Sequence, residues 1–251
     1  MDTSKLKVEF YRIKNLGYVP NVKSDANDGG AGNTFEHHLG VVENNLKEPD
    51  FQGFEVKTKK NYLKSSSPIS LFTLRPTYPP DGDAYMRSNW GEPDSVFQNV
   101  LCFRTSLYAD RWSVVYKKSK LKIEVNRSEQ KVYIVKADLK ENITDRTVYW
   151  SFEDIHRGAK KLHNLFLVDA DVKNVAGRDS FHYTSATVFL DYIGQDNFID
   201  LLEAGLIRYD NRLGVHRPDT PKPGTPHNHG GGFRLHKKYV HKLYKTVLEI
   251  E

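Results

Sequence analysis

The residues with the clearest capacity for chemistry occupy one octapeptide, Asp50-Phe51-Gln52-Gly53-Phe54-Glu55-Val56-Lys57. Its second half is expected to form a short strand, in which successive side chains alternate between two faces. Phe54 and Val56 then point into a core, and Glu55 and Lys57 lie together at its edge. The Gln52-Gly53 pair permits a turn or bulge that would bring the Asp50 carboxylate beside Glu55.

Two carboxylates that converge on one point form a site for a hard cation such as Mg²⁺, to which the Val56 carbonyl is a third oxygen ligand. Lys57, one pleat further along, can orient a water or stabilise charge on a phosphate. The alternative is a solvated strand edge with an ion pair, because an acidic residue followed by Glu-x-Lys is common by chance.

The elements that must position this octapeptide include two helices before it. Residues 4–16 place apolar side chains at helical spacing and are expected to form a packing helix. Residues 23–33 are rich in Gly, Asn and Asp and are expected to form a loop. This loop contains several glycines, but it lacks the preceding strand and the following Lys-Ser/Thr of a P-loop.

A second helix is expected to begin at Asn33 or Thr34. Its apolar stripe would be formed by Phe35, Leu39, Val42 and Leu46. Glu36 would lie in the first turn, where an acidic residue stabilises the helix dipole without any role in chemistry. The functional alternative is that Glu36 faces the metal site, since the chain between it and Asp50 is long enough for a helix to leave and a strand to return.

Beyond the octapeptide the sequence predicts mostly antiparallel strands, and the fold class is α+β with a mixed sheet. Residues 79–83 are expected to form a turn, and Ser151 with Asp154 forms a capping box. The expected helices span residues 151–162, 196–204 and a terminal segment that carries Tyr239, Val240, Leu243 and Val247. The expected strands span residues 69–74, 100–105, 112–117, 121–126, 131–135, 165–168 and 206–215.

A second group of candidate residues lies near the end of the chain. Asp210 and Arg212 are two positions apart in an expected strand, so they project from one face. In a DNA major groove arginine donates to guanine O6 and N7 and aspartate accepts from cytosine N4, so this pair can read one C·G pair. His227 and His229 share a face in the same way if that stretch is extended, and Arg234 adds another donor.

Two alternatives apply to this second group. Asp210 and Arg212 could form a surface ion pair that contributes little. His-x-His could bind zinc, but no further cluster of suitable ligands follows nearby in the sequence. The glycines at residues 230–232 allow the backbone to approach a ligand closely.

Composition bounds the class of protein and its compartment. At 251 residues and 28.9 kDa the chain is expected to form one large domain or two lobes, and its net charge of +5 suits a partner with phosphates. The single cysteine, Cys102, excludes a disulfide framework and is expected to be buried in the core. No apolar run approaches the ~20 residues of a membrane span, and the N-terminus has no signal-peptide pattern. We therefore expect a soluble protein of a reducing, cytoplasmic compartment.

Several motifs follow one another along most of the chain. They are Gly32-Asn33-Thr34-Phe35-Glu36, Pro49-Asp50-Phe51 with Glu55-Val56-Lys57-Thr58, Leu71-Phe72-Thr73, Val148-Tyr149-Trp150-Ser151-Phe152, Asp210-Asn211-Arg212-Leu213-Gly214, His227-Asn228-His229-Gly230 and Phe233-Arg234. The catalytic part resembles the PD-(D/E)xK nuclease signature. The whole set resembles the MvaI/BcnI family of type II restriction endonucleases, which is related to the MutH mismatch-repair nickase.

This resemblance implies a restriction-endonuclease-like fold with two lobes, in which residues 1–145 form a catalytic lobe and residues 146–251 a DNA-recognition lobe. It implies a Mg²⁺-dependent, monomeric, prokaryotic enzyme that cuts double-stranded DNA and has a companion DNA methyltransferase. The family's catalytic residues correspond to Glu36, Asp50, Glu55 and Lys57, and its base-reading residues to Asp210, Arg212, His227, His229 and Arg234. The implied targets are short sites of the CCWGG, CCSGG or CCNGG type.

Three other functions remain open on the sequence, and one of them is a zinc hydrolase built on His-x-His. A mismatch-repair-type nicking endonuclease would need an activating partner. A non-cleaving DNA-binding protein would keep the recognition half alone, although a complete set of Asp50, Glu55 and Lys57 favours an enzyme.

Overall fold

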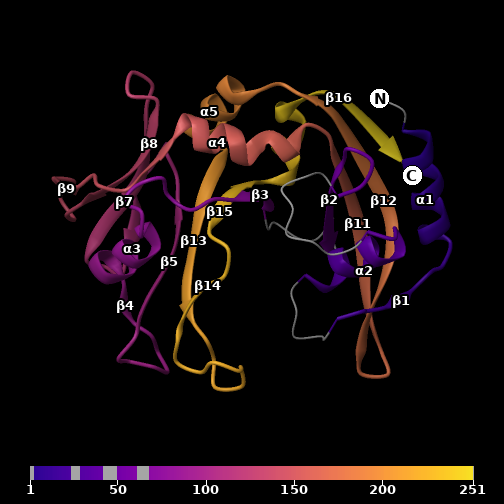
Figure 1. The fold of residues 1–251 in the computed structure, drawn as a ribbon, viewed down its shortest axis with the longest axis horizontal. Coiled ribbons are helices and arrows are strands. Elements are labelled where there is room, and N and C mark those ends of the chain that lie inside the picture. Colours follow the sequence, from indigo (N-terminus) through magenta and orange to yellow (C-terminus); the bar gives the residue numbers. More distant parts are fainter. Residues whose placement is uncertain (1–2, 24–28, 42–49, 61–67, 251) are drawn as a thin grey trace. The chain divides into compact units, whose positions relative to one another are not determined.

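The computed structural model describes residues 3–23, 29–41, 50–60 and 68–250. The chain divides into two compact units, each assembled from separate stretches of sequence (Figure 1). Unit 1 comprises residues 1–69, 160–193 and 238–251, and unit 2 comprises residues 70–159 and 194–237. The chain thus passes from unit 1 to unit 2 twice, and each time it returns to unit 1. The expected single boundary between residues 145 and 146 does not coincide with this division.

Within its described residues, unit 1 is built on one mixed five-stranded sheet. Its elements are α1 (Ser4–Lys14), β1 (Val19–Pro20), α2 (Gly30–His38), β2 (Glu55–Lys60), the short 3-10 helix η2 (Lys160–Leu162), β11 (Leu165–Val175), β12 (Arg178–Tyr192), the 3-10 helix η3 (Lys237–Leu243, which begins at the last residue of unit 2) and β16 (Tyr244–Ile250). The strand order is β1-β12-β11-β2, and β16 also pairs with β12. β2 and β11 run parallel, whereas β12 is antiparallel to all three of its neighbours.

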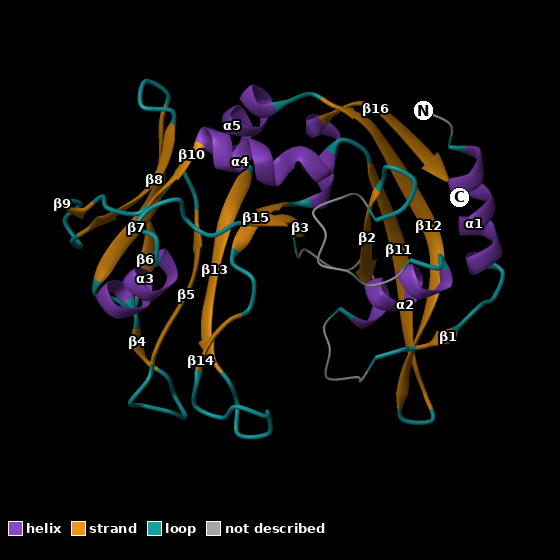
Figure 2. Cartoon of the chain, viewed as in Figure 1, coloured by secondary structure: helices purple, strands orange, loops and turns teal. Residues whose placement is uncertain are grey.

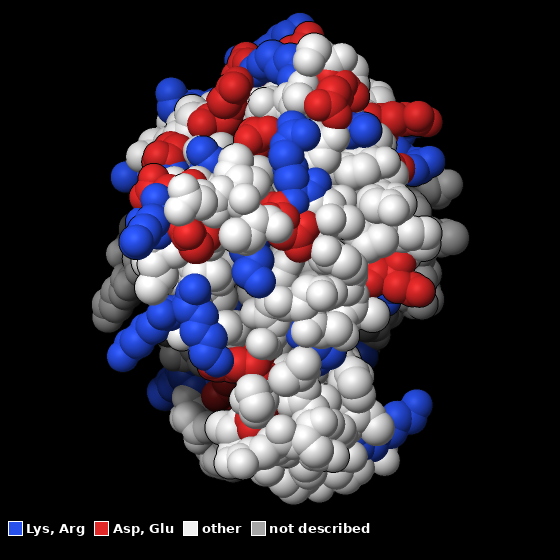
Figure 3. Space-filling view, turned by 90° about the vertical axis from the view of Figure 1, so that its left-hand side faces the viewer, with Lys and Arg blue, Asp and Glu red and all other residues white. Residues whose placement is uncertain are grey.

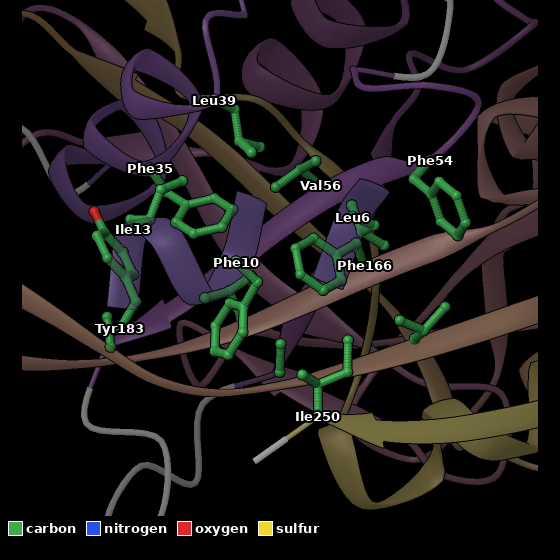
Figure 4. Close-up of a cluster of buried hydrophobic side chains, with 14 of the residues drawn as sticks. Leu6, Phe10, Ile13, Phe35, Leu39, Phe54, Val56, Phe166, Tyr183 and Ile250 are labelled. Carbon is green, nitrogen blue, oxygen red and sulfur yellow. The ribbon is translucent and has the colours of Figure 1, made fainter. Parts of the chain in front are cut away.

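The core of unit 1 lies where α1 and α2 meet this sheet. The helix expected over residues 4–16 is present as α1, and it buries Leu6, Phe10 and Ile13 at the predicted spacing. Figure 4 shows these side chains gathered with Phe35 of α2 and Phe166 of β11. The ring of Phe10 meets that of Phe166 edge-on at 6.2 Å, a favourable aromatic geometry.

Helix α2 starts earlier than the sequence predicts. Gly30 already belongs to the helix, so the predicted loop is wrong from that residue onward, and Thr34 lies within the helix. Tertiary packing explains the difference. A Cβ on Gly30 would lie 2.7 Å from the Asn21 side chain, and Tyr183 donates a 2.9 Å hydrogen bond to the Ala31 carbonyl. The helix ends at His38, and the expected stripe residues Val42 and Leu46 lie outside the described residues.

The expected terminal helix is present only in part, because Tyr239, Val240 and Leu243 lie in the 3-10 helix η3 whereas Val247 lies in a strand. After η3, β16 pairs along β12 with register from Tyr244↔Tyr192 to Ile250↔Ala186. The apolar residues of this segment fit a helical period, but Tyr244 and Ile250 are buried and Val247 is 41% exposed. Pairing with the long central strand β12, which the sequence did not predict, overrides the local helical pattern.

Unit 2 contains the remaining elements, with two sheets and three α-helices (Figure 2). They are β3 (Ile69–Thr73), α3 (Gly82–Trp90), β4 (Glu92–Pro93), β5 (Leu101–Leu107), β6 (Ser113–Val115), β7 (Ser119–Asn126), β8 (Lys131–Ala137), β9 (Ile143–Asp145), β10 (Tyr149–Ser151), α4 (Phe152–Ala159), α5 (Gln195–Glu203), β13 (Ile207–Val215), β14 (Pro226–Asn228) and β15 (Gly232–Leu235). One sheet has the order β3-β15-β13-β5-β4 with β14 paired to β13. The other has the order β10-β8-β7-β6 with β9 paired to β8.

Most predicted elements of unit 2 are confirmed. The capping box is present, because Ser151 Oγ accepts a 3.1 Å hydrogen bond from the Asp154 N–H at the start of α4. The turn expected at residues 79–83 is present up to Asp81, and helix α3 begins at Gly82. Cys102 is only partly buried, so its expected place in the core is wrong. No helix in the described ranges is long and apolar enough to cross a membrane.

A buried carboxylate fixes the loop that precedes β5. Asp94 is 2% exposed and accepts hydrogen bonds of 2.7 and 3.0 Å from the two terminal nitrogens of Arg217. It also accepts bonds from the Val96 and Phe97 N–H groups. The bond to Arg217 is the main reason that the pKa of Asp94 is lowered to about 2, against an opposing effect of burial.

We therefore expect Asp94→Asn to lower the melting temperature by several degrees at neutral pH. A depressed pKa means that ionised Asp94 stabilises the fold above the carboxyl pKa of the unfolded chain and that this stability is lost as pH falls toward 2. The difference in melting temperature between wild type and variant should hence shrink as pH falls below 4. A difference that stays constant down to pH 2 would contradict the assignment.

Candidate active site and base-reading face

The octapeptide from Asp50 to Lys57 contains a tight two-residue turn. The residues on either side of Gln52-Gly53 exchange backbone hydrogen bonds of 3.0 and 2.8 Å. Both central residues have positive φ, 48° for Gln52 and 85° for Gly53, which is the requirement of a type I′ turn. The turn places Asp50 beside the start of β2, where its Oδ2 accepts a 2.9 Å hydrogen bond from the Val56 N–H.

Strand β2 separates its chemically active side chains from its core side chains. Phe54 and Val56 are 1% and 2% exposed and lie in the core of unit 1 (Figure 4). Glu55 is 1% exposed although it is acidic, and Lys57 Nζ contacts Glu55 Oε1. Pairing with β11 fixes the register with Glu55 opposite Leu165. A slip of one residue would exchange the two faces, so this register is essential to the site.

A second lysine, which sequence reasoning missed, also reaches Glu55. Lys161 lies in η2, and its Nζ is 2.7 Å from Glu55 Oε1, the oxygen that Lys57 contacts. The other oxygen, Glu55 Oε2, is buried and has no hydrogen-bond partner among the described residues. An ionised carboxylate is retained in the interior only when it is compensated. The lysines compensate one oxygen and leave the second available to a ligand.

Asp50 is electrostatically coupled to this carboxylate. Burial raises the pKa of Asp50 above its ordinary value, and the nearby Glu55 raises it further. The Val56 N–H, Lys57 and Lys161 act in the opposite direction. Two close carboxylates of this kind gain most from a shared cation, because the cation removes their mutual repulsion.

The oxygen donors present here fit a hard divalent metal ion. Asp50 and Glu55 supply two carboxylates, the Val56 carbonyl is a neighbouring main-chain oxygen, and the unpartnered Oε2 is a buried acceptor. No group of three or more His, Cys, Asp or Glu residues able to hold a metal occurs among the residues that the structure describes. This set suits Mg²⁺, which binds through one or two carboxylates and keeps several waters.

Glu36 lies in the last turn of α2, so its expected place in the first turn is wrong. An acidic residue there is unfavourable for the helix dipole, and helix stability does not explain it. Glu36 is partly buried and lies near Tyr183, where it adds to the effect of burial in raising the pKa of that phenol. It does not join Asp50 and Glu55 in a three-carboxylate metal group among the described residues.

The second group of candidates gathers on one face of β13 in unit 2. Alternation places Arg208, Asp210 and Arg212 on one side and buries Tyr209 and Leu213 on the other. The antiparallel neighbours β5 and β15 set further polar residues opposite them. We call the resulting surface the polar face; its members are Arg104, Ser106, Arg208, Asp210, Arg212 and Arg234.

Asp210 is the centre of a hydrogen-bonded cluster on the polar face. Ser106 Oγ donates a 2.7 Å hydrogen bond to Asp210 Oδ1, and Arg208 Nη2 donates one of 3.0 Å to Oδ2. Arg234 Nε lies 3.2 Å from the same Oδ2. Tyr108 accepts a 3.0 Å hydrogen bond from Arg208 Nη1. Asp210 and Arg234 therefore meet as a pair, and sequence reasoning missed Ser106 and Arg208.

Three histidine rings are in contact beside the polar face. The rings of His227 and His229 meet edge-on with centroids 4.2 Å apart, and the His216 ring lies against His227 at 4.2 Å with an angle of 34° between the planes. Burial lowers the pKa of His227 and of His229, and neighbouring histidines and arginines lower both further. The described residues nevertheless contain no group of three ligands placed to hold a metal, so the arrangement gives the zinc alternative no support.

The glycines at residues 230–232 meet protein rather than open space. A Cβ on Gly232 would lie 2.4 Å from the Phe72 carbonyl, and one on Gly231 would lie 2.7 Å from the Tyr209 hydroxyl. Close packing within the protein therefore explains Gly231 and Gly232 without a ligand. They allow β15 to pack closely against β3 and the aromatic core of unit 2.

Charges on another part of unit 2 are of both signs. Figure 3, seen from the side where β8 and β9 are labelled in Figure 1, shows Lys and Arg intermixed with Asp and Glu. Lys120 pairs with Glu141 and Arg146 with Glu124, each at 2.7 Å. The positive net charge does not form a uniform basic surface on this side.

The sheet of unit 1, with Asp50, Glu55 and Lys57 at its β2 edge, defines a restriction-endonuclease-like nuclease. The sequence model of the MvaI/BcnI restriction endonuclease family matches residues 7–244. The chain belongs to this family, and it is a type II restriction endonuclease, a site-specific deoxyribonuclease. Family membership also implies a general dependence on a divalent metal ion.

Solved structures agree with this assignment. The chain is similar, at 25% identity and a TM-score of 0.88, to a structure described as the restriction endonuclease MvaI–cognate DNA substrate complex, with 100% of both chains covered. It is also similar to MvaI in the absence of DNA, at 27% identity and a TM-score of 0.60, with 98% of this chain and 96% of that chain covered. None of the curated proteins matches this chain.

Proposed function

We propose that unit 1 carries a Mg²⁺-dependent hydrolytic centre and that unit 2 reads the base sequence of duplex DNA. The observation that carries the first part is the meeting of Asp50, Glu55 and Lys57, with a buried Glu55 oxygen that has no partner among the described residues. The polar face carries the second part, because its arginines and its one carboxylate match the acceptors and donors of C·G pairs.

In this proposal Asp50, Glu55 and the Val56 carbonyl hold the metal ion. When bound, Mg²⁺ supplies a Lewis acid that stabilises negative charge on the scissile phosphate and makes water acidic enough to attack it. Lys57 orients the attacking water and donates to the phosphoryl oxygens as their charge grows. Glu36 assists through an ordered water or a second ion. Attack in line with the 3′ oxygen breaks the P–O3′ bond and leaves a 5′-phosphate and a 3′-hydroxyl.

Recognition is proposed to use Asp210 and Arg212 on an outer C·G pair, with His227, His229 and Arg234 on neighbouring pairs. Arg234 and Asp210 already contact each other, so this donor and this acceptor are held in place before DNA arrives. Preorganisation reduces the entropy lost on binding. The target is a short pseudopalindromic C/G-flanked site of the CCWGG, CCSGG or CCNGG type.

The decisive experiment is digestion of a plasmid with Mg²⁺, followed by sequencing of the fragment ends. Cuts at one short C/G-flanked site would support both halves of the proposal. Nicking that requires an added protein would favour a mismatch-repair-type enzyme. Tight specific binding without cutting would favour a non-cleaving DNA-binding protein.

The enzyme is proposed to act as a monomer with one hydrolytic centre. Such an enzyme nicks one strand, rebinds in the other orientation and cuts the second strand. A digestion time course should show nicked circles before linear DNA, and sedimentation should give the monomer mass. A companion DNA methyltransferase and a prokaryotic cytoplasmic location complete the proposal, since an unprotected genome would be cut.

We expect Asp50→Asn to abolish the stabilisation that divalent ions give the wild-type protein. The amide oxygen can still accept the bond from Val56, but it no longer offers a charged ligand. Millimolar Ca²⁺ should raise the wild-type melting temperature by a few degrees through preferential binding to the folded state and should leave the variant unchanged. Without metal the variant should be at least as stable as wild type, because burial disfavours an ionised Asp50. Equal Ca²⁺ shifts would remove Asp50 from the metal site.

A further inference from the structure

One pair on the polar face opposes like charges. Arg104 of β5 is the Cα partner of Arg212 of β13 across an antiparallel ladder. Directly opposite residues have Cβ atoms about 5 Å apart, and like charges placed this way destabilise a sheet. The next pair on the same face, Ser106↔Asp210, shows that this ladder can accommodate a carboxylate, yet the fold keeps two arginines opposite each other here.

The arginines of the polar face fall into two classes. Arg208 and Arg234 are bound to Asp210, at 2.8 and 3.2 Å for their closest ion-pair contacts. Arg104 and Arg212 take part in none of the ion pairs found among the described residues. Asp210 carries one negative charge, so it engages both of the first two guanidinium groups and offsets one of their two positive charges. The charges of Arg104 and Arg212 are offset by no ion pair in the described part of the chain.

The Arg104 side chain is directed across β13 rather than away from it. A Cβ on Gly214 would lie 2.4 Å from Arg104 Nη2 and 2.9 Å from His229 Nε2, so both groups pass over this glycine. His229 is exposed, and burial, His227, Arg104 and Arg212 lower its pKa in that order. The absence of a side chain at Gly214 therefore brings Arg104, Arg212 and His229 together on one patch.

We propose that Arg104 is a specificity-determining residue, which acts beside Arg212 on the acceptor edge of guanine in the major groove. This inference rests on the proposed function of unit 2. Guanidinium groups carry only donors, and guanine is the base whose major-groove edge offers two acceptors, O6 and N7, with no donor or methyl group. Successive bases on a strand are about 3.4 Å apart, so two arginines with Cβ atoms about 5 Å apart can address neighbouring base pairs.

The test combines a protein variant with a change to one atom of the DNA. Binding of the full-length protein, without divalent metal, is measured on the duplex site identified by the digest and on duplexes with 7-deazaguanine at each guanine in turn. Wild type should lose about 10-fold in affinity at the guanine that Arg104 contacts, a value at the lower end for a bidentate pair. Arg104→Gln should lose a similar factor on the normal site and show no further loss with 7-deazaguanine at that position.

A matched control is Arg127→Gln, which removes the same charge from unit 2 where Arg127 pairs with Asp200 and Glu203. This variant should show the same loss of affinity as wild type at each guanine replaced by 7-deazaguanine, a set of values that we call the 7-deazaguanine profile. Thermal unfolding gives an independent readout, because removal of Arg104 relieves repulsion with Arg212 and should leave the melting temperature equal or higher. If Arg104 has only a structural role, Arg104→Gln should lower the melting temperature and leave the 7-deazaguanine profile as it is in wild type.

Two results would overturn the inference. If Arg104→Gln weakens binding to all sequences equally and reduces the salt slope by about 1, Arg104 contacts a phosphate instead. If its 7-deazaguanine profile equals that of wild type, Arg104 reads no guanine, while the proposed function of unit 2 stands. If the wild-type protein binds this site no more tightly than other duplexes, the proposed function of unit 2 is refuted, and this inference is refuted with it.

Discussion

Replacement of Lys57 by methionine should reduce DNA cleavage by about 10²- to 10³-fold, the usual effect of removing one donor that stabilises transition-state charge. Methionine keeps most of the aliphatic stem and removes only the ammonium group that contacts Glu55 Oε1. Lys161 still pairs with this oxygen, so the buried carboxylate stays compensated and the fold should persist. Single-turnover cleavage of the cognate site measures the effect, and binding without metal should be nearly unchanged.

The control for this variant is Lys60→Met on the same strand. Lys60 lies over the Phe181 ring at 5.4 Å and has no contact with the catalytic carboxylates. Its replacement removes one positive charge from β2 and should leave the cleavage rate within a small factor of wild type. Cleavage by Lys57→Met at the wild-type rate would show that the hydrolytic centre lies elsewhere.

Replacement of Asp210 by asparagine should change specific and non-specific binding in opposite directions. The carboxylate accepts from Ser106 and Arg208 and lies against Arg234, so its loss disorients these donors and removes the acceptor proposed for cytosine. One base contact of this kind is worth about 1–3 kcal/mol, which is about 5- to 150-fold in affinity for the cognate site. Affinity for random duplex should rise, because one negative charge disappears from a surface of arginines.

Competition between cognate and random duplexes at two salt concentrations measures both changes. Asp200→Asn is the matched control, since Asp200 pairs with Arg127 at an exposed site of unit 2. It should leave the ratio of cognate to random affinity intact. A preserved ratio for Asp210→Asn would remove Asp210 from the recognition site.

The sequence predicted that Asp50, Glu55 and Lys57 lie together, because the geometry that unites them is local. A strand alternates its faces, and Gln52-Gly53 suits the turn before it, so Asp50, Glu55 and Lys57 are brought together by a few consecutive residues. Lys161 could not be found in this way. It reaches Glu55 through the parallel pairing of β2 with β11, a contact between distant parts of the chain, and its own neighbours in sequence mark nothing unusual.

Glu36 shows how a wrong boundary changes an interpretation. Helix propensity and capping rules favour a start at Asn33 or Thr34, since Gly30 is a poor helix residue. Close packing of Gly30 on Asn21 and the hydrogen bond from Tyr183 move the start upstream. The acidic residue then lies at the wrong end of the helix for its dipole, a conflict between local preference and observed position that is typical of functional residues.

On the polar face the strand period predicted Asp210 and Arg212 but not their neighbours. Arg104, Ser106 and Arg208 join the surface through the register of β5 against β13 and through the hydrogen bonds of Asp210. Register across a sheet is set by tertiary structure and leaves no periodic trace in one strand. Helix α3 was missed for a related reason, because its Arg87 donates to the Leu101 and Gly214 carbonyls and packing fixes the helix there.

The final strand β16 has a consequence for biosynthesis. It pairs with the second half of β12, buries Ile250 in the core of unit 1, and places Tyr244 close enough to Glu55 for that carboxylate to add to burial in raising the tyrosine pKa. A ribosome delivers these residues only after both stretches of unit 2 have been made. A nascent chain that has not yet reached β16 therefore lacks the strand whose Tyr244 lies near Glu55. Completion of the sheet around the proposed hydrolytic centre thus waits for the synthesis of unit 2.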